Sequence, residues 1–92
     1  MLFFSADWCA PCLQLKKYVF SDKRVVGASQ RLVNVYIDTD ANPELVTTYG
    51  IRGIPAIFFL KPDGQMIGKF SGDPTVSNFV KQMAAVADKH TR

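Results

Sequence analysis

The stretch that decides the fold reads Leu2-Phe3-Phe4-Ser5-Ala6-Asp7-Trp8-Cys9-Ala10-Pro11-Cys12. A short apolar run predicts a buried strand over residues 2–5, and the pattern after Cys12 predicts a helix over about residues 10–20. Both cysteines then lie at the first helical turn, where free backbone N–H groups and the helix dipole stabilise a thiolate. Pro11 suits that turn because its missing N–H is not needed there. The sequence therefore predicts dithiol–disulfide exchange by Cys9 and Cys12.

Other uses of a Cys-x-x-Cys pair stay open but are less favoured. A structural disulfide across so small a loop would constrain the unfolded chain little. A zinc ion needs four ligands, and His90 near the C-terminus is the one histidine, so we expect no metal site. A metallochaperone of the ferredoxin-like class would also carry such a pair near its N-terminus. Trp8 beside the pair and Pro11 within it favour a redox turn.

Length and composition indicate a single globular domain over residues 1–92. A net charge of +3 is mild, and the basic residues are scattered, so the sequence does not predict a nucleic-acid surface. No apolar run is long enough to cross a membrane, and no signal peptide is visible. Met1 falls at the start of a core strand, which suggests a fragment of a longer protein or a misplaced start.

The rest of the chain alternates between strand and helix. The first helix ends near Phe20 or extends toward Val26, with a separate turn at Ser21-Asp22 as the alternative. Residues 27–30 are expected to be loop. A β-rich segment predicts a second strand over residues 32–37, parallel to the first.

The second half contributes a short helix, a hairpin and a long helix. Asn42 is the predicted N-cap of the short helix, and Gly50 ends it. A third strand follows Pro55, and a Pro-Asp-Gly turn returns the chain into an antiparallel strand over residues 66–70. Asp73 is the predicted N-cap of the last helix, whose apolar stripe packs on the core.

The chain resembles the thioredoxin family from Leu2 to about Lys89. The residues that carry the resemblance are Ala6-Asp7-Trp8-Cys9-Ala10-Pro11-Cys12, Tyr49-Gly50-Ile51-Arg52-Gly53-Ile54-Pro55-Ala56 and Lys61-Pro62-Asp63-Gly64. It implies an α/β thioredoxin-like fold: a central four-stranded mixed sheet flanked by three helices, without the family's usual first strand and helix.

The resemblance also implies roles for individual residues. Cys9 would be the attacking thiol and Cys12 the resolving one, with Pro11 and Asp7 in support. A cis-proline, Pro55, would lie against the disulfide. Residues matching the family's apolar groove for the partner polypeptide are Trp8, Ile54, Pro55 and Gly72.

Several positions depart from the family pattern. Phe3 replaces a buried Asp, and Asn34 aligns with the Lys that pairs with it, so both charges are missing together. Ser5 replaces a Trp four residues before the first cysteine. The family's helix proline is absent too, which predicts a first helix without a kink. We expect Asp7 to be solvated and Cys12 to lose its proton to water or to the partner.

A subgroup resemblance comes from Lys17-Tyr18-Val19-Phe20-Ser21-Asp22 with Val25, which is similar to the C-terminal domain of the bacterial membrane reductase DsbD. It implies a periplasmic reductase or electron relay, with a cytoplasmic location as the alternative. The expected partners are protein thiols and disulfides, with a thioredoxin reductase-like protein or a membrane thiol relay upstream. We expect a monomer without metal or organic cofactor. A disulfide oxidase or isomerase, or a binding module with a structural disulfide, remains the alternative.

Overall fold

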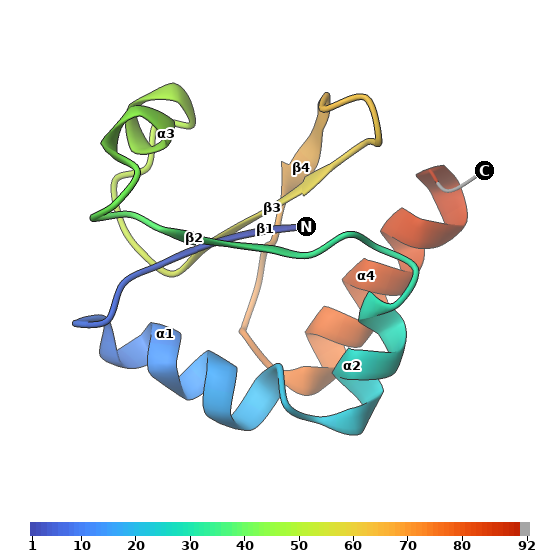
Figure 1. The fold of residues 1–92 in the computed structure, drawn as a ribbon. Coiled ribbons are helices and arrows are strands. Elements are labelled where there is room, and N and C mark those ends of the chain that lie inside the picture. Colours follow the sequence, from blue (N-terminus) through green and yellow to red (C-terminus); the bar gives the residue numbers. More distant parts are fainter. Residues whose placement is uncertain (91–92) are drawn as a thin grey trace.

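The computed structural model describes residues 1–90, with the backbone alone described for His90. Its centre is a four-stranded mixed sheet in the order β2-β1-β3-β4 (Figure 1). The strands run over Leu2–Ser5 (β1), Val35–Asp38 (β2), Ala56–Leu60 (β3) and Met66–Lys69 (β4). The thioredoxin-like fold predicted from the sequence is confirmed.

The pairing of the strands explains why the first strand lies in the interior of the sheet. β1 pairs parallel with β2, where Phe3 is opposite Tyr36, and antiparallel with β3, where Phe3 is opposite Ile57. β3 and β4 form the predicted antiparallel hairpin, with an irregularity between Phe59 and Leu60. A strand with neighbours on both sides and helices over both faces is largely apolar, as β1 is from Leu2 to Phe4.

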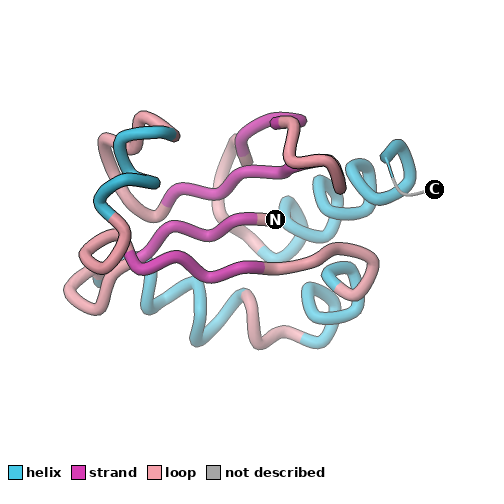
Figure 2. Tube along the Cα trace, turned by 45° about the horizontal axis from the view of Figure 1, so that its top comes forward, coloured by secondary structure: helices cyan, strands magenta, loops and turns pink. Residues whose placement is uncertain are grey.

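Helices cover the two faces of the sheet unequally, as Figures 1 and 2 show. One face carries α3 alone (Pro43–Thr48). The other carries α1 (Ala10–Gln14) with its π-helical continuation η1 (Leu15–Val19), α2 (Lys23–Ser29) and α4 (Val76–His90). We call these the α3 face and the cysteine face. Within residues 1–90, no helix is both long and apolar enough to span a bilayer.

Each face has its own core because consecutive residues of β1 point to opposite sides. Phe4 belongs to the core of the α3 face, together with Ile37, Ala56 and Phe58. Phe3 belongs to the core of the cysteine face, whose other buried members are Cys9, Cys12, Leu15, Val25, Ile57, Phe59, Phe79 and Met83. The disulfide is thus part of the larger core.

The first helical region differs from the prediction of one unkinked helix. It widens into η1, where the Phe20 N–H donates to the Leu15 carbonyl five residues earlier, at 2.8 Å. The Phe20 ring packs edge-on against Phe3 and Phe79, with 5.0 Å between ring centroids in each pair. The wide turn therefore accompanies an aromatic anchor that points into the core.

A second helix, α2, begins just after Ser21-Asp22, where the sequence predicted a separate turn as the alternative to a longer first helix. Asp22 is its N-cap, and the carboxylate accepts the Arg24 N–H at 2.9 Å. The predicted loop over residues 27–30 is wrong, because α2 continues through Ser29. The predicted number of three helices around the sheet is also wrong, since α2 is a helix separate from α1 and η1. Gly27 lowers helix propensity, but Val25 is buried in the core and holds α2 in place.

Smaller corrections concern boundaries and caps. β2 begins at Val35 rather than at residue 32, because residues 32–34 still belong to the connection from α2. The predicted cap Asp73 is wrong: Thr75 immediately precedes α4, and its hydroxyl accepts the Asn78 N–H at 3.2 Å. Asn42 does precede α3, but its side chain donates to the Asp38 carbonyl instead of capping the helix.

Candidate functional site

The redox pair lies where β1 ends and α1 begins. Cys9 and Cys12 form a disulfide. The Cys9 N–H donates to the Ala6 carbonyl at 3.1 Å, which turns the chain back from the strand into the helix. Cys9 is the N-cap of α1, and its sulfur accepts the Cys12 N–H at 3.2 Å. A sulfur at this position receives a free N–H of the first turn, as the sequence predicted.

The two sulfur-bearing residues differ in access to solvent. Cys9 keeps 3% of its surface exposed, whereas Cys12 has none. Pro11 between them is exposed in the first turn of α1. A partner would reach Cys9 more easily than Cys12, which agrees with the roles that the family resemblance implies for the two cysteines.

Trp8, one of the groove residues predicted from the sequence, is 69% exposed. Its indole N–H donates to the Asp40 carboxylate at 2.9 Å, and the Asp40 N–H in turn donates to the Asp38 carboxylate. The sequence analysis assigned residues 38–41 to a turn and missed this contact. The signal was available, because the carboxyl ends of the parallel strands β1 and β2 meet at one edge of the sheet.

The other predicted groove residues lie in two loops. The Ile54–Pro55 peptide bond is cis, as expected, and both residues are half-buried just before β3. Ile54 packs against the core that contains both cysteines. Gly72 is exposed in the loop between β4 and α4 with a φ of 88°, a left-handed conformation that favours glycine. Its place in the groove stays a prediction.

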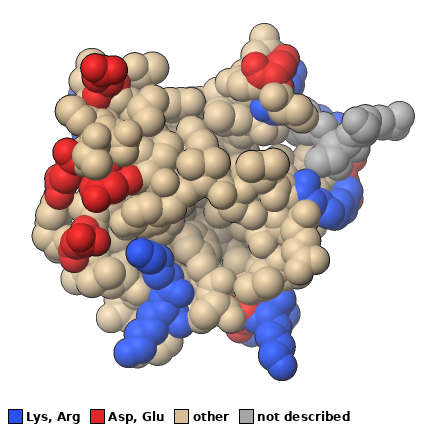
Figure 3. All heavy atoms as spheres, viewed as in Figure 1, with Lys and Arg blue, Asp and Glu red and all other residues tan. Residues whose placement is uncertain are grey.

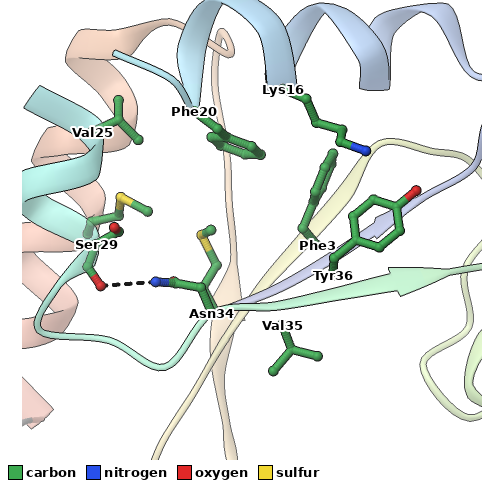
Figure 4. Close-up of a pocket in the computed structure, with 10 residues that line it drawn as sticks. Phe3, Lys16, Phe20, Val25, Ser29, Asn34, Val35 and Tyr36 are labelled. Carbon is green, nitrogen blue, oxygen red and sulfur yellow. Dashed lines mark hydrogen bonds between the residues drawn. The ribbon is translucent and has the colours of Figure 1, made fainter. Parts of the chain in front are cut away.

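Neither position that lacks the family's buried charges supplies a base. Phe3 lies in the core and lines an apolar pocket of about 290 Å³. Asn34 points away from Phe3, and its amide donates to the Ser29 and Leu32 carbonyls (Figure 4). The Lys16 ammonium group in the same pocket lies 4.4 Å from the centroid of the Tyr36 ring. Asp7 is exposed, as expected.

Charge is distributed unevenly over the surface. Figure 3 shows acidic side chains gathered on the side where α3 and the end of β2 lie, and basic side chains below, over the helices of the cysteine face. Asp38, Asp40 and Glu44 are the acidic residues of β2, α3 and their connection. The surroundings of the redox pair are therefore partly acidic in a chain whose net charge is +3.

Sequence comparisons place the chain among proteins with this chemistry. Residues 1–87 match a family model described as a thioredoxin-like domain. Thioredoxin 1 of Synechococcus elongatus is 33% identical over 87 residues, which cover 95% of this chain and 75% of that protein. The thiol:disulfide interchange protein DsbD of Photorhabdus laumondii is 37% identical over 71 residues, or 73% of this chain. The chain spans 12% of that DsbD protein.

Solved structures agree with the sequence matches. A thioredoxin from Thermus thermophilus superposes with a TM-score of 0.83 over 98% of this chain and 74% of that one, at 26% identity. The reduced C-terminal domain of DsbD from Neisseria meningitidis gives a TM-score of 0.75 over 91% of this chain and 76% of that one, at 30% identity.

Proposed function

Since this chain belongs to the family of thioredoxin-like domains and is a thiol–disulfide oxidoreductase, we propose that it works in the reducing direction. In this proposal the chain reduces disulfides of other proteins and is itself reduced again by an upstream thiol protein. Dithiol–disulfide exchange carries the electrons, so the reaction needs no metal or organic cofactor.

The proposed cycle starts from the dithiol. The Cys9 thiolate attacks one sulfur of a substrate disulfide, and the other substrate sulfur leaves as a thiolate. The Cys12 thiolate then attacks the Cys9 sulfur, which forms the Cys9–Cys12 bond and releases the second substrate thiolate. The substrate gains two electrons and the chain loses two. The helix N-terminus supports the first step, because the Cys12 N–H already donates to the Cys9 sulfur.

The direction is argued from Cys12 and from the residues between the cysteines, because the helix N–H supports Cys9 alone. A dithiol protein is a strong oxidant when its reduced form is stabilised. Here the residues within the motif, Ala10 and Pro11, carry no charge. Cys12 is fully buried, and burial disfavours a thiolate. Weak stabilisation of the reduced form supports a low reduction potential, and the burial of Cys12 is the observation on which this proposal rests.

Equilibration with glutathione tests the direction. We expect a reduction potential near that of thioredoxin, about −270 mV. A potential at or above about −180 mV, in the range of protein disulfide isomerase, would favour the oxidase or isomerase alternative. A Cys9 thiol that resists alkylation after treatment with dithiothreitol would instead favour a binding module with a structural disulfide.

The upstream partner is proposed from the relatives. Thioredoxins and DsbD proteins are both among them, so the electron donor is either a thioredoxin reductase-like enzyme or a membrane thiol relay. Incubation of the oxidised chain with NADPH and a bacterial thioredoxin reductase separates the two. Stoichiometric NADPH oxidation supports the soluble donor, and its absence with an active control thioredoxin favours the membrane relay.

A further inference from the structure

Ser5 carries a buried hydroxyl that the redox chemistry described so far does not use. None of its surface is exposed. Its Oγ has no hydrogen-bond partner among the residues that the structure describes. The Ser5 backbone carbonyl is satisfied, because it accepts the Thr39 N–H at 2.9 Å. A buried hydroxyl without a partner is unfavourable, so its presence at the end of β1 calls for an explanation.

Strand geometry places this hydroxyl on the cysteine face. Phe3 points into the core that contains Cys9 and Cys12, and Phe4 points to the α3 face. Side chains alternate along a strand, so Ser5 shares the side of Phe3. Ser5 is also the last residue of β1, so it lies at the end of the strand that leads into the redox motif. The Cys9 N–H donates to the carbonyl of Ala6, the residue after Ser5.

Charged groups around this position already have other contacts or lie at the surface. Asp38 is opposite Ser5 in the β1–β2 register, and its carboxylate accepts the Asp40 N–H at 2.9 Å. Lys16 of η1 lies over the Tyr36 ring, and Asp7 is exposed. β3 carries no charged residue, and those of α4 whose side chains are described are exposed: Lys81, Asp88 and Lys89.

We propose that in the reduced protein the Ser5 hydroxyl donates a hydrogen bond to the Cys12 sulfur, as the buried partner of the resolving thiolate. This rests on the dithiol cycle proposed above. Opening the disulfide gives Cys12 a thiolate state, a stronger hydrogen-bond acceptor than a disulfide sulfur, at a site without solvent. Among the residues whose burial is described, Ser5 is the buried polar side chain on that face. The Ser5 hydroxyl keeps its proton throughout. The proton of Cys12 leaves to water or to the departing substrate thiolate when Cys12 attacks Cys9.

The pKa of Cys12 in the reduced protein tests the proposal. Burial raises the pKa of a thiol, and a hydrogen bond to the thiolate lowers it again. We expect Ser5→Ala to raise the Cys12 pKa by about one pH unit, which is a tenfold loss of thiolate below that pKa. Because a more basic thiolate is also more nucleophilic, the resolving step should slow only about threefold. NMR titration of reduced protein labelled with ¹³C at Cys Cβ reads each cysteine separately.

Three further variants make the result decisive. Ser5→Thr keeps the hydroxyl and should restore the Cys12 titration, whereas Ser77→Ala on the exposed surface of α4 should leave it unchanged. An unchanged Cys12 pKa in folded Ser5→Ala would overturn the proposal. So would a shift in Asp38→Asn that exceeds the shift in Ser5→Ala. The titration does not depend on redox direction, so a high reduction potential would contradict the proposed reductase and leave this proposal standing.

Discussion

The two faces of the sheet share β1 but differ in what they bury. Behind Phe4, the α3 face has a small core that contains only apolar side chains among its buried members. Behind Phe3, the cysteine face has a larger core that includes both sulfurs and shares its side of β1 with the Ser5 hydroxyl. The helices α1 with η1, α2 and α4 cover this face, while the short α3 covers the other (Figure 1).

This difference suggests a division between stability and chemistry. The α3 face contributes hydrophobic burial and, through the residues before α3, the Asp40 contact that holds Trp8. The cysteine face must keep a sulfur reactive within an apolar core, where burial disfavours its charged form. A substitution among the buried core residues of the α3 face should therefore change the free energy of unfolding alone. One on the cysteine face should change stability and thiol reactivity together.

The largest effect is expected at the cysteines themselves. Cys9→Ser should abolish reduction of a protein disulfide, because no attacking thiolate remains at the accessible position. Cys12→Ser should still attack and then accumulate a mixed disulfide on Cys9. Turnover assays and intact-mass spectrometry measure the two outcomes. Multiple turnovers by Cys12→Ala would refute the two-cysteine cycle.

The next largest effect is expected from a buried acid at residue 3. Phe3→Asp should lose about 3–5 kcal/mol of stability or more, since it removes a core ring and buries a carboxylate. Burial would raise the pKa of that carboxyl. The loss of stability caused by the charge should therefore be small below the pKa of the carboxyl in the unfolded chain, about 3.9. It should grow as the pH rises from there toward the raised pKa in the folded chain. Denaturant unfolding at several pH values measures it.

The matched control for this variant is Phe3→Asn, which has the same shape without a titrating carboxyl. Its stability should not show the same pH dependence. Equal stability of the two variants at pH 7 would mean that a cation reaches the cysteine face. Lys16 is the candidate, because its ammonium group lies over Tyr36, whose ring packs against Phe3 at 5.8 Å between centroids.

The sequence was sufficient for the parts of the fold with strong local signals. The redox motif, the parallel β1–β2 pair and the hairpin after Pro55 each combine a hydrophobic pattern with a recognisable turn. The division of the first helical region was harder. Residues such as Val25 and Gly27 fit either an exit from a helix or a new one, and only packing against the core decides that they form α2.

The site shows the same limit. The motif indicated Cys9 and Cys12, but the sequence showed Ser5 only as a replacement for a Trp of the family pattern. What makes Ser5 interesting is its complete burial and its unpartnered hydroxyl, which depend on the tertiary structure. Asp40 was assigned to a polar turn for a similar reason. Its contact with Trp8 spans 32 residues of sequence.

A smaller effect on stability is expected at the start of α2. The Arg24 side chain and then its backbone N–H hold the pKa of Asp22 below its ordinary value of 3.8. The stability that the Asp22 charge contributes is therefore fully present above pH 3.8 and is lost as the pH falls through the lowered pKa. Asp22→Ala should lower the thermal midpoint by a few degrees at pH 7, and Asp22→Asn by less, because Asn can still cap the helix.

Calorimetry at pH 7 and at low pH measures this effect, and the gap between Asp22→Asn and the unchanged chain should narrow in acid. A midpoint for Asp22→Ala equal to that of the unchanged chain would show that α2 is held by its core contacts alone. The helix α2 covers the cysteine face but is separate in sequence from the disulfide motif. A large change in the rate of disulfide reduction would therefore contradict the expected role of Asp22 in stability alone.

The smallest effect is expected at Asp7, the carboxylate nearest to the cysteines in sequence. Asp7 is exposed, so water and salt screen its field at Cys9. Its negative charge slightly disfavours the Cys9 thiolate, and Asp7→Asn should therefore change the rate of disulfide reduction only about two- to threefold. Glu44→Gln, an exposed acid on the α3 face, is the matched control and should change the rate less. A hundredfold loss in Asp7→Asn would have the size typical of a missing general base. Asp7 would then be the proton acceptor of Cys12, and the chemistry would depend on a solvated carboxylate rather than on the interior of the cysteine face.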